Sequence, residues 1–207
     1  MFKYYKIPSG DILEKILGEK ATIKFSSAFN LNDTFELKFN LDIEPEYDGH
    51  EKAFYDRNPD STKEDFERWK SHALNHHGYT WYAEQAIRDS LAQNISLCSF
   101  SKNNTSNLMW SHYTDNYKGI CIEYNEELFD YLHSLKNHIA SDIITYSETP
   151  PILKGSDPVD IIAKKLMFNK QIEWQYEEEY RIIIRSDENT EFIPIDRSLI
   201  KSCFYRF

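Results

Sequence analysis

The sequence predicts a single α+β domain in which mixed and antiparallel sheets carry peripheral helices. Segments with strand character and segments with helical period are mixed along the chain. The length of 207 residues fits one hydrophobic core, because domains usually contain roughly 100–200 residues. The composition is 41% hydrophobic and 28% charged, as in a soluble globular protein, and the 15% aromatic share indicates an aromatic core or pocket. We therefore expect residues 1–207 to form one domain, with a helical insertion at about 44–94.

The N-terminal part predicts a strand, a short helix and further extended segments. Residues 2–7 are aromatic and β-branched, and Pro8 ends this strand because it lacks an N–H. Apolar residues at helical spacing follow, with Gly18 at the position expected for a C-cap. Residues 21–26 predict the next strand, and alternating Phe and Leu over 35–43 predict a half-buried extended segment.

Residues 44–94 separate two strand-rich parts of the chain. The acidic stretch 44–61 has no sustained period, which predicts an exposed connection. Ser61 and Glu64 have the spacing of a capping box, so a helix should begin there, and a second helix should cover 79–94. We expect the insertion to act as a lid or specificity element.

The remainder of the chain alternates strands with two helices. Pro158 is expected at the start of the second helix, where its missing N–H is not needed. The expected strands are 95–101, 118–124, 139–146, 179–185 and a short one at 191–195, and the expected helices are 126–137 and 158–170.

Charge and cysteine content limit the classes of function. The net charge of −10 removes the general attraction to phosphate backbones, so nucleic acid is not favoured as a partner. Cys98, Cys121 and Cys203 have no close pairing in sequence, which favours free thiols. No apolar run approaches the roughly 18 residues that a membrane span needs, and the N-terminus lacks a signal-peptide pattern. We therefore expect a cytoplasmic protein without a membrane partner.

The common catalytic and metal-binding motifs are absent from the sequence. It contains no GxGxxG, Walker A, GxSxG or CxxC motif. His72 and His76 have the i, i+4 spacing that could hold a metal on one helix face, but the glutamate of HExxH and a third ligand are missing. We expect a solvated helix face there, and no metal.

The segment "WQYEEEYRIII" places charges directly before a buried strand. In a strand, Glu177, Glu179 and Arg181 would share one face because side chains alternate. One interpretation is an edge-strand charge ladder in which Arg181 pairs with a glutamate. The other is a site where a carboxylate polarises a hydroxyl and Arg181 holds an anionic group in bidentate fashion.

A second polar and aromatic stretch, "SNLMWSHYTDNYKGICIEYN", precedes another strand. Trp110, His112 and Tyr113 could pack in the core or could line a pocket. Gly119 could begin the strand at a point where a side chain would block a ligand.

Four segments resemble the bacterial domain of unknown function 2971 family. They are "FSSAFNLNDTFE", "SLCSFSKNNTSNLMWSHYTDNYKGICIEYN", "ITYSETPP" and "KQIEWQYEEEYRIII", in this order. The family usually has proline after the first aspartate, and Thr34 stands there in this chain. The layout also looks like that of ADP-ribosyltransferases, which implies a cleft between the sheets and NAD as a substrate. Lys3 or Tyr4 occupies the place where those enzymes carry histidine or arginine.

The resemblance implies roles for these residues. Glu179 would bond to the ribose of NAD and stabilise the growing positive charge as nicotinamide leaves, and Glu177 would face the acceptor. Aromatic faces can hold the nicotinamide ring by stacking and cation–π attraction, so Trp110 and Tyr113 would form the pocket wall with His112 beside them. Arg181 and either Lys3 or Tyr4 complete the expected NAD-binding set.

The resemblance also implies a biological setting. The acceptor would be an unknown macromolecule, and the protein would be a toxin or phage-defence effector with a partner or antitoxin protein. The alternative is a non-catalytic module that binds a ligand or partner in the same aromatic cleft.

Overall fold

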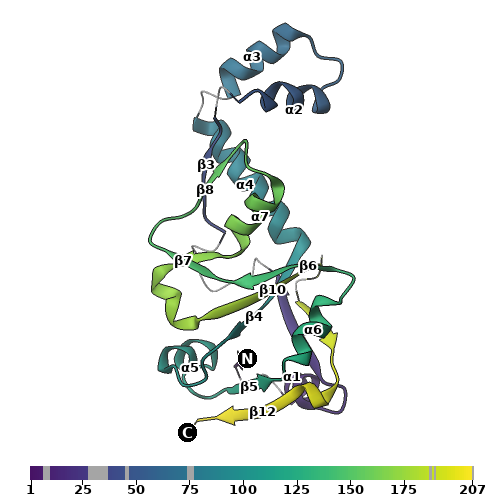
Figure 1. Ribbon diagram of the computed structural model, residues 1–207, viewed down its shortest axis with the longest axis vertical. Helices are drawn as coiled ribbons and strands as arrows, with labels where there is room; N and C mark the ends of the chain where they lie inside the picture. Colours follow the sequence, from purple (N-terminus) through teal and green to yellow (C-terminus); the bar gives the residue numbers. More distant parts are fainter. Residues whose placement is uncertain are drawn as a thin grey trace.

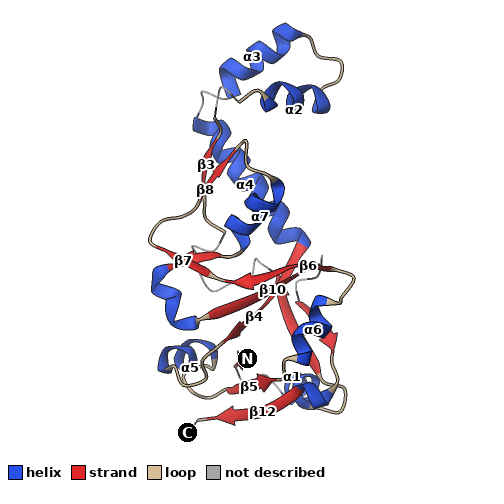
Figure 2. Cartoon of the chain, viewed as in Figure 1, coloured by secondary structure: helices blue, strands red, loops and turns tan. Residues whose placement is uncertain are grey.

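A computed structural model describes residues 1–6, 10–27, 37–44, 47–73, 77–186, 188 and 190–206 of the chain. A large antiparallel sheet forms the body of the protein, with helices beside it and a pair of helices at the far end of the molecule (Figures 1 and 2). This arrangement confirms the predicted α+β class. The strands of this sheet are β1 (Phe2–Tyr5), β2 (Thr22–Ser27), β4 (Ile95–Ser101), β5 (Ile120–Tyr124), β6 (His138–Ile143), β10 (Glu179–Arg185), β11 (Thr190–Pro194) and β12 (Ile200–Tyr205).

The sheet divides at β4. Along one edge of β4, β10 pairs over the whole length of the strand, and β6 pairs with the far side of β10. Along the other edge, β2 pairs with Ser96 and Leu97, whereas β1 meets β4 only at Ser101. β1 and β2 therefore diverge between these points, and Lys3 Nζ donates to the Ser99 carbonyl in this gap at 3.3 Å. β5 and β12 extend the sheet beyond β1, and β11 extends it beyond β2.

Each face of the central strands has its own hydrophobic cluster. Cys98, Phe100 and Ile182 belong to one cluster, together with side chains of α1 (Gly10–Leu17) and α6 (Glu127–His133). Leu97 and Ile183 belong to the other, together with side chains of α7 (Val159–Met167). The alternation of side chains along β4 and β10 produces this division, because neighbouring residues point to opposite faces.

Two short parallel strand pairs accompany the sheet. β3 (Asn40–Asp42) pairs with β8 (Ile152–Lys154), and β7 (Thr145–Ser147) pairs with β9 (Asn169–Gln171). The expected strand 139–146 is therefore two strands, β6 and β7, which belong to different sheets. Of the extended segment expected over 35–43, only β3 is a strand among the described residues, and residues 28–36 lie outside them.

The helical insertion consists of two different parts. α2 (Gly49–Arg57) and α3 (Lys63–Ala73) form a hairpin with its own aromatic cluster, in which the rings of Phe54 and Phe66 lie 5.5 Å apart. Figure 1 shows this hairpin at one end of the molecule, beyond β3 and β8. In contrast, α4 (His77–Asn94) packs against the body, where Arg88 Nε donates to the Leu37 carbonyl at 3.2 Å. The stretch 44–61, expected to be an exposed connection without a sustained period, is mostly exposed among its described residues, but α2 occupies half of it.

Two expected helix ends differ in detail. The capping box of α3 is formed by Thr62 and Asp65, each of which accepts the main-chain N–H of the other, and not by Ser61 and Glu64. Gly18 follows α1 as expected, but it has no positive φ; its N–H continues the helical pattern to the Glu14 carbonyl at 2.8 Å. The cysteines are free as predicted, with Cys98 and Cys121 buried and Cys203 exposed.

Candidate functional site

The charges of "WQYEEEYRIII" meet at the start of β10. The segment before it is not a strand but the 3₁₀ helix η2 (Ile172–Glu177), so alternation along a strand does not place Glu177 beside Glu179. Glu178 between them has a φ of 44°, in the left-handed region, and its own side chain is exposed. The carboxylates on either side of this left-handed residue are both buried.

Lys170 of β9 lies between the two carboxylates. Its Nζ is 2.7 Å from Glu177 Oε2 and 3.4 Å from Glu179 Oε2. Arg181 completes the cluster: its Nε donates to Glu179 Oε1 at 2.8 Å, and its Nη1 donates to the Met167 carbonyl at 2.9 Å. Glu179 and Arg181 share a strand face as predicted. These four side chains, which we call the charged cluster, are 1–6% exposed.

The two carboxyl groups of the charged cluster have pKa values on opposite sides of their ordinary range. Burial raises the pKa of Glu177 to about 7, and the negative charge of Glu179 adds to this effect, while Lys170 opposes it. Burial also acts to raise the pKa of Glu179, but Arg181 and Lys170 outweigh it and hold the pKa well below its usual range. Near neutral pH, Glu179 is therefore ionised and Glu177 is shared between its protonated and ionised forms.

Tyr113 joins helix α5 (Asn107–Tyr113) to the charged cluster. Its hydroxyl donates to Glu177 Oε1 in a short hydrogen bond. Burial and the neighbouring Glu177 raise the pKa of this phenol far above its ordinary value, so Tyr113 stays protonated and remains a donor. The Ser106 hydroxyl caps α5 by accepting the Met109 N–H at 3.4 Å, which fixes the start of the helix that carries Tyr113.

An aromatic group borders the charged cluster. His112 Nδ1 lies 2.8 Å from the Tyr176 hydroxyl, and the ring of Trp174 lies 6.0 Å from each of these two rings. Lys170 Nζ is 5.0 Å from the centroid of the Trp174 ring, so the lysine links the aromatic group to the carboxylates. His112 is exposed, and Trp174 and Tyr176 are partly exposed.

Trp110, Tyr4 and Lys3 have structural contacts instead. Trp110 is 1% exposed, its Nε1 donates to the Asn104 carbonyl at 2.7 Å, and the rings of Trp110 and Tyr4 are 5.5 Å apart. The Arg206 guanidinium lies 5.0 Å from the Trp110 ring on the side of the C-terminal strand. The Tyr4 hydroxyl donates to a main-chain carbonyl, as Lys3 does in the sheet gap. Trp110 is therefore a core residue that anchors α5.

Gly119 is needed for packing. A Cβ at this position would overlap the Tyr5 carbonyl of β1 and would lie 2.6 Å from the Thr114 Cβ. Glycine thus allows the chain entering β5 to approach β1 closely, and the expectation that it leaves room for a ligand was wrong.

Sequence reasoning missed four residues of the site. Lys170, Trp174 and Tyr176 complete the charged and aromatic groups, and the Tyr146 hydroxyl accepts the Glu179 N–H at 2.9 Å. One signal was available, since two inward-facing glutamates in a core require cations, and Lys170 is a short distance upstream of them.

No metal cluster is present in the part of the chain that the structure describes, where no group of three or more His, Cys, Asp or Glu side chains could hold an ion. His72 Nδ1 lies 3.0 Å from the Arg68 carbonyl on the exposed surface of α3, and His76 lies outside the described residues. No described helix is long and apolar enough to cross a membrane.

The fold and the site together define an α+β protein with a buried carboxylate–lysine–arginine cluster beside aromatic rings. Residues 109–182 match the family model "Protein of unknown function (DUF2971)", which confirms the resemblance to this family over that segment. The matched segment runs from α5 into β10 and includes Tyr113 and all four residues of the charged cluster. No curated protein and no solved structure matches the chain.

Proposed function

We propose that the protein cleaves the bond between nicotinamide and ribose in NAD and transfers ADP-ribose to a macromolecular acceptor. The observation that carries this proposal is the geometry of the charged cluster, in which Lys170 Nζ lies 2.7 Å from Glu177 Oε2 and 3.4 Å from Glu179 Oε2, with the Trp174 ring 5.0 Å from the same Nζ. The pKa values of the two carboxyl groups are shifted in opposite directions by this arrangement. Pairs of titratable groups whose environments push their pKa values apart are typical of acid–base sites. The similarity of the sequence layout to ADP-ribosyltransferases supports the choice of reaction.

Glu179 stabilises the positive charge that develops on the ribose. An ionised carboxylate in a dry environment is well suited to an oxocarbenium-like transition state, because the attraction is weakly screened there. The position for a ribose hydroxyl is Glu179 Oε2, since its present contact with Lys170 Nζ is the longer one, at 3.4 Å. The Arg181 bond to Oε1 holds the carboxylate in place and keeps it charged.

Glu177 accepts the proton of the attacking group. A general base works best when its pKa is near the working pH, and the value of about 7 meets this condition. The Tyr113 hydroxyl and Lys170 Nζ bond to different oxygens of Glu177, so they fix the orientation of the carboxyl group.

The aromatic group positions the leaving group. Trp174 and Tyr176 present partly exposed rings beside Lys170, so a planar nicotinamide can stack on them. These rings take the role that the sequence had suggested for Trp110, which is buried.

Two isosteric variants test this mechanism. Glu179→Gln should lower both NAD hydrolysis and transfer by about 10²- to 10³-fold, because both reactions need the same charge stabilisation. Glu177→Gln should lose transfer and keep most of the hydrolysis. Nicotinamide release and labelling of bacterial lysate from labelled NAD measure the two activities, and the exposed Glu178→Gln is the matched control. Wild-type activity in Glu179→Gln would refute the assignment.

One observation favours the second candidate, a non-catalytic binding module. All four residues of the charged cluster are buried, and both oxygens of Glu179 already contact cations. If the cluster is purely structural, NAD is not consumed, and both variants lower the unfolding temperature without separating any activities. A thermal-shift series with NAD, nicotinamide and ADP-ribose then identifies the ligand class.

A further inference from the structure

Arg206 follows β12 and contacts the N-terminal end of α5. Its Nη1 donates to Asn107 Oδ1 at 2.8 Å, and its Nη2 donates to the Thr105 carbonyl at 3.0 Å. Its guanidinium also lies 5.0 Å from the centroid of the Trp110 ring, which is buried in the core. One planar group thus contacts the segment before α5, the first residue of α5 and the residue that anchors the helix.

The C-terminal end of α5 continues into a strained turn. Asp115, Asn116 and Tyr117 all have φ in the left-handed region, at 51°, 55° and 68°. Non-glycine residues keep such values only where surrounding contacts hold them. In this turn the Asn116 N–H donates to the Ser111 carbonyl at 3.1 Å. The Tyr117 N–H donates to the Trp110 carbonyl at 3.3 Å. Both acceptors belong to α5, so these two bonds do not fix the position of the helix relative to the sheet.

Tyr113 is the last residue of α5, so the orientation of the helix determines where its hydroxyl lies. The helix is short, and its 7 residues span roughly 10 Å at about 1.5 Å per residue. A tilt of about 10° at one end of such a helix displaces the other end by about 1.5–2 Å, which is enough to break a hydrogen bond. The bond from Tyr113 to Glu177 therefore depends on contacts at the opposite end of α5.

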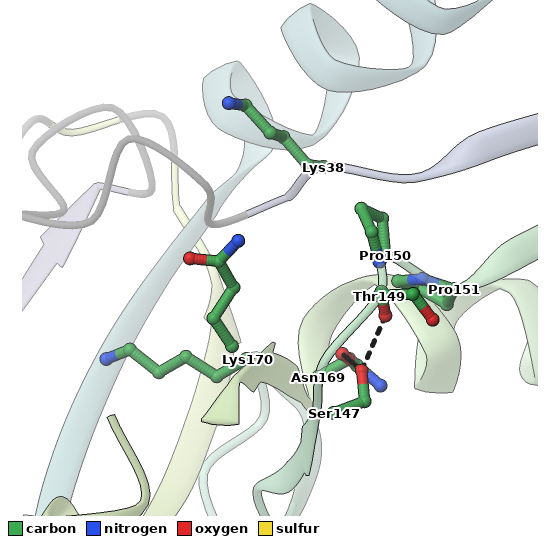
Figure 3. A pocket seen from close by; sticks show the side chains of 8 residues that line it. Lys38, Ser147, Thr149, Pro150, Pro151, Asn169 and Lys170 are labelled. Carbon is green, nitrogen blue, oxygen red and sulfur yellow. Dashed lines mark hydrogen bonds between the residues drawn. The ribbon is translucent and has the colours of Figure 1, made fainter. Parts of the chain in front are cut away.

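The other bond to Glu177 does not depend on α5. Lys170 Nζ donates to Glu177 Oε2 at 2.7 Å, and Lys170 lies on β9, which pairs with β7. Ser147 Oγ of β7 lies 3.2 Å from Asn169 Oδ1 of β9, next to Lys170 (Figure 3). A movement of α5 should therefore remove the Tyr113 bond and leave the Lys170 bond.

We propose that Arg206 is a positioning residue of the charged cluster, because it holds the N-terminal end of α5 and thereby keeps the Tyr113 hydroxyl on Glu177. Arg206 acts through the helix and through Tyr113. The inference goes beyond the proposed function, since it concerns what orients Glu177 whichever ligand the charged cluster serves.

The pKa of Glu177 reports whether the Tyr113 bond is present. The ionisable groups that face Glu177 are those of Lys170, Glu179 and Tyr113, and the bond from Tyr113 lowers the pKa because it stabilises the ionised form. An NMR titration of the full chain with labelled glutamate carboxyl carbons measures this pKa, and Glu177→Gln assigns the signal. Tyr113→Phe should raise the pKa from about 7 by about one unit, since a hydrogen bond to a charged group is worth about this much.

Arg206→Gln should also raise the pKa of Glu177, by a comparable amount. Arg206→Lys keeps the positive charge but not the planar fork of donors, so it should give the same rise. Lys201→Gln is the matched control. It removes another cation of β12, which bonds to Glu123 at 2.6 Å, and it should leave the pKa of Glu177 unchanged.

A double variant separates positioning from direct electrostatics. Tyr113→Phe combined with Arg206→Gln should have the same Glu177 pKa as Tyr113→Phe alone, because Arg206 acts only through the Tyr113 bond. Asn107→Ala removes one acceptor of Arg206 from the side of α5, so it should raise the pKa by a smaller amount. This variant provides the test if Arg206→Gln does not fold, and unfolding temperatures establish which variants are folded.

An unchanged pKa of Glu177 in folded Arg206→Gln or Asn107→Ala would show that Arg206 only stabilises the fold, and would overturn the proposal. Recovery of the wild-type pKa in Arg206→Lys, or additive shifts in the double variant, would overturn it as well, because the charge alone would then explain the effect. The titration needs no substrate. A protein that does not consume NAD would therefore refute the proposed function and leave this inference standing.

Discussion

The substitution Glu177→Gln should change how the stability of the protein depends on pH. The pKa of Glu177 is raised from 4.5 to about 7 by burial, so the folded state binds more protons than the unfolded state between these values. The contribution of Glu177 therefore lowers the free energy of unfolding as the pH rises through this window. Below pH 4.5 this unfavourable contribution is absent, and above about 7 it is complete.

The shift in the pKa of Glu177 sets the size of this change in the free energy of unfolding. At about 1.4 kcal/mol per pKa unit, a rise from 4.5 to about 7 corresponds to about 3 kcal/mol. Glutamine resembles the protonated carboxyl group and does not titrate. The free energy of unfolding of Glu177→Gln relative to wild type should therefore increase by about 3 kcal/mol between pH 4.5 and 8. A constant offset from altered contacts with Lys170 or Tyr113 does not affect this difference.

Urea unfolding followed by tryptophan fluorescence measures these free energies, since the chain has four tryptophans. Glu178→Gln is the matched control, because it removes an exposed neighbouring carboxylate, and it should follow wild type at each pH. Below pH 4.5, the free energy of unfolding of Glu179→Gln relative to wild type should show the opposite trend and rise as the pH falls. The lowered pKa of Glu179 contributes stability above pH 4.5 that is lost as the pH falls further, and the variant lacks it. A difference for Glu177→Gln that stays flat from pH 4.5 to 8 would refute the reasoning.

Two further predictions concern packing. Gly119→Ala should lower the free energy of unfolding by about 1–3 kcal/mol, because its Cβ would overlap the Tyr5 carbonyl. Gly155→Ala is the control and should lower the free energy of unfolding less, because the nearest contact of its Cβ would be at 3.1 Å. Equal losses of the two variants in urea unfolding would contradict this account. Replacing residues 47–73 with a short Gly-Ser linker should leave the unfolding of the rest of the protein nearly unchanged, because α2 and α3 have their own aromatic cluster. Arg88→Ala on α4 should lower the free energy of unfolding, because Arg88 bonds to the Leu37 carbonyl. Loss of folding on removal of the hairpin would show that the hairpin is part of the core.

Local sequence patterns predicted much of the fold. The segment "ISLCSFS" and the apolar run after Arg181 predicted β4 and β10 at their observed ends, because strand formation and burial depend strongly on residues that are neighbours in sequence. The acidic composition of 44–61 was misleading. α2 lies there because a few aromatic residues, Phe54 among them, pack against α3, and such a contact between helices has no local signature.

The candidate site was predictable in part. The sequence by itself determined that Glu177, Glu179 and Arg181 are neighbours, and that Tyr113 precedes a buried strand. Only the tertiary structure decided that Lys170 lies between the glutamates and that Tyr113 donates to Glu177. Tyr113 is 64 residues from Glu177 in the chain, and the residue pattern predicted a strand where the 3₁₀ helix η2 connects β9 to β10. The tertiary structure also determines the different protonation states of the Glu177 and Glu179 carboxyl groups. Both residues are glutamate and both are buried, and their pKa values diverge because Arg181 contacts only Glu179 among the two.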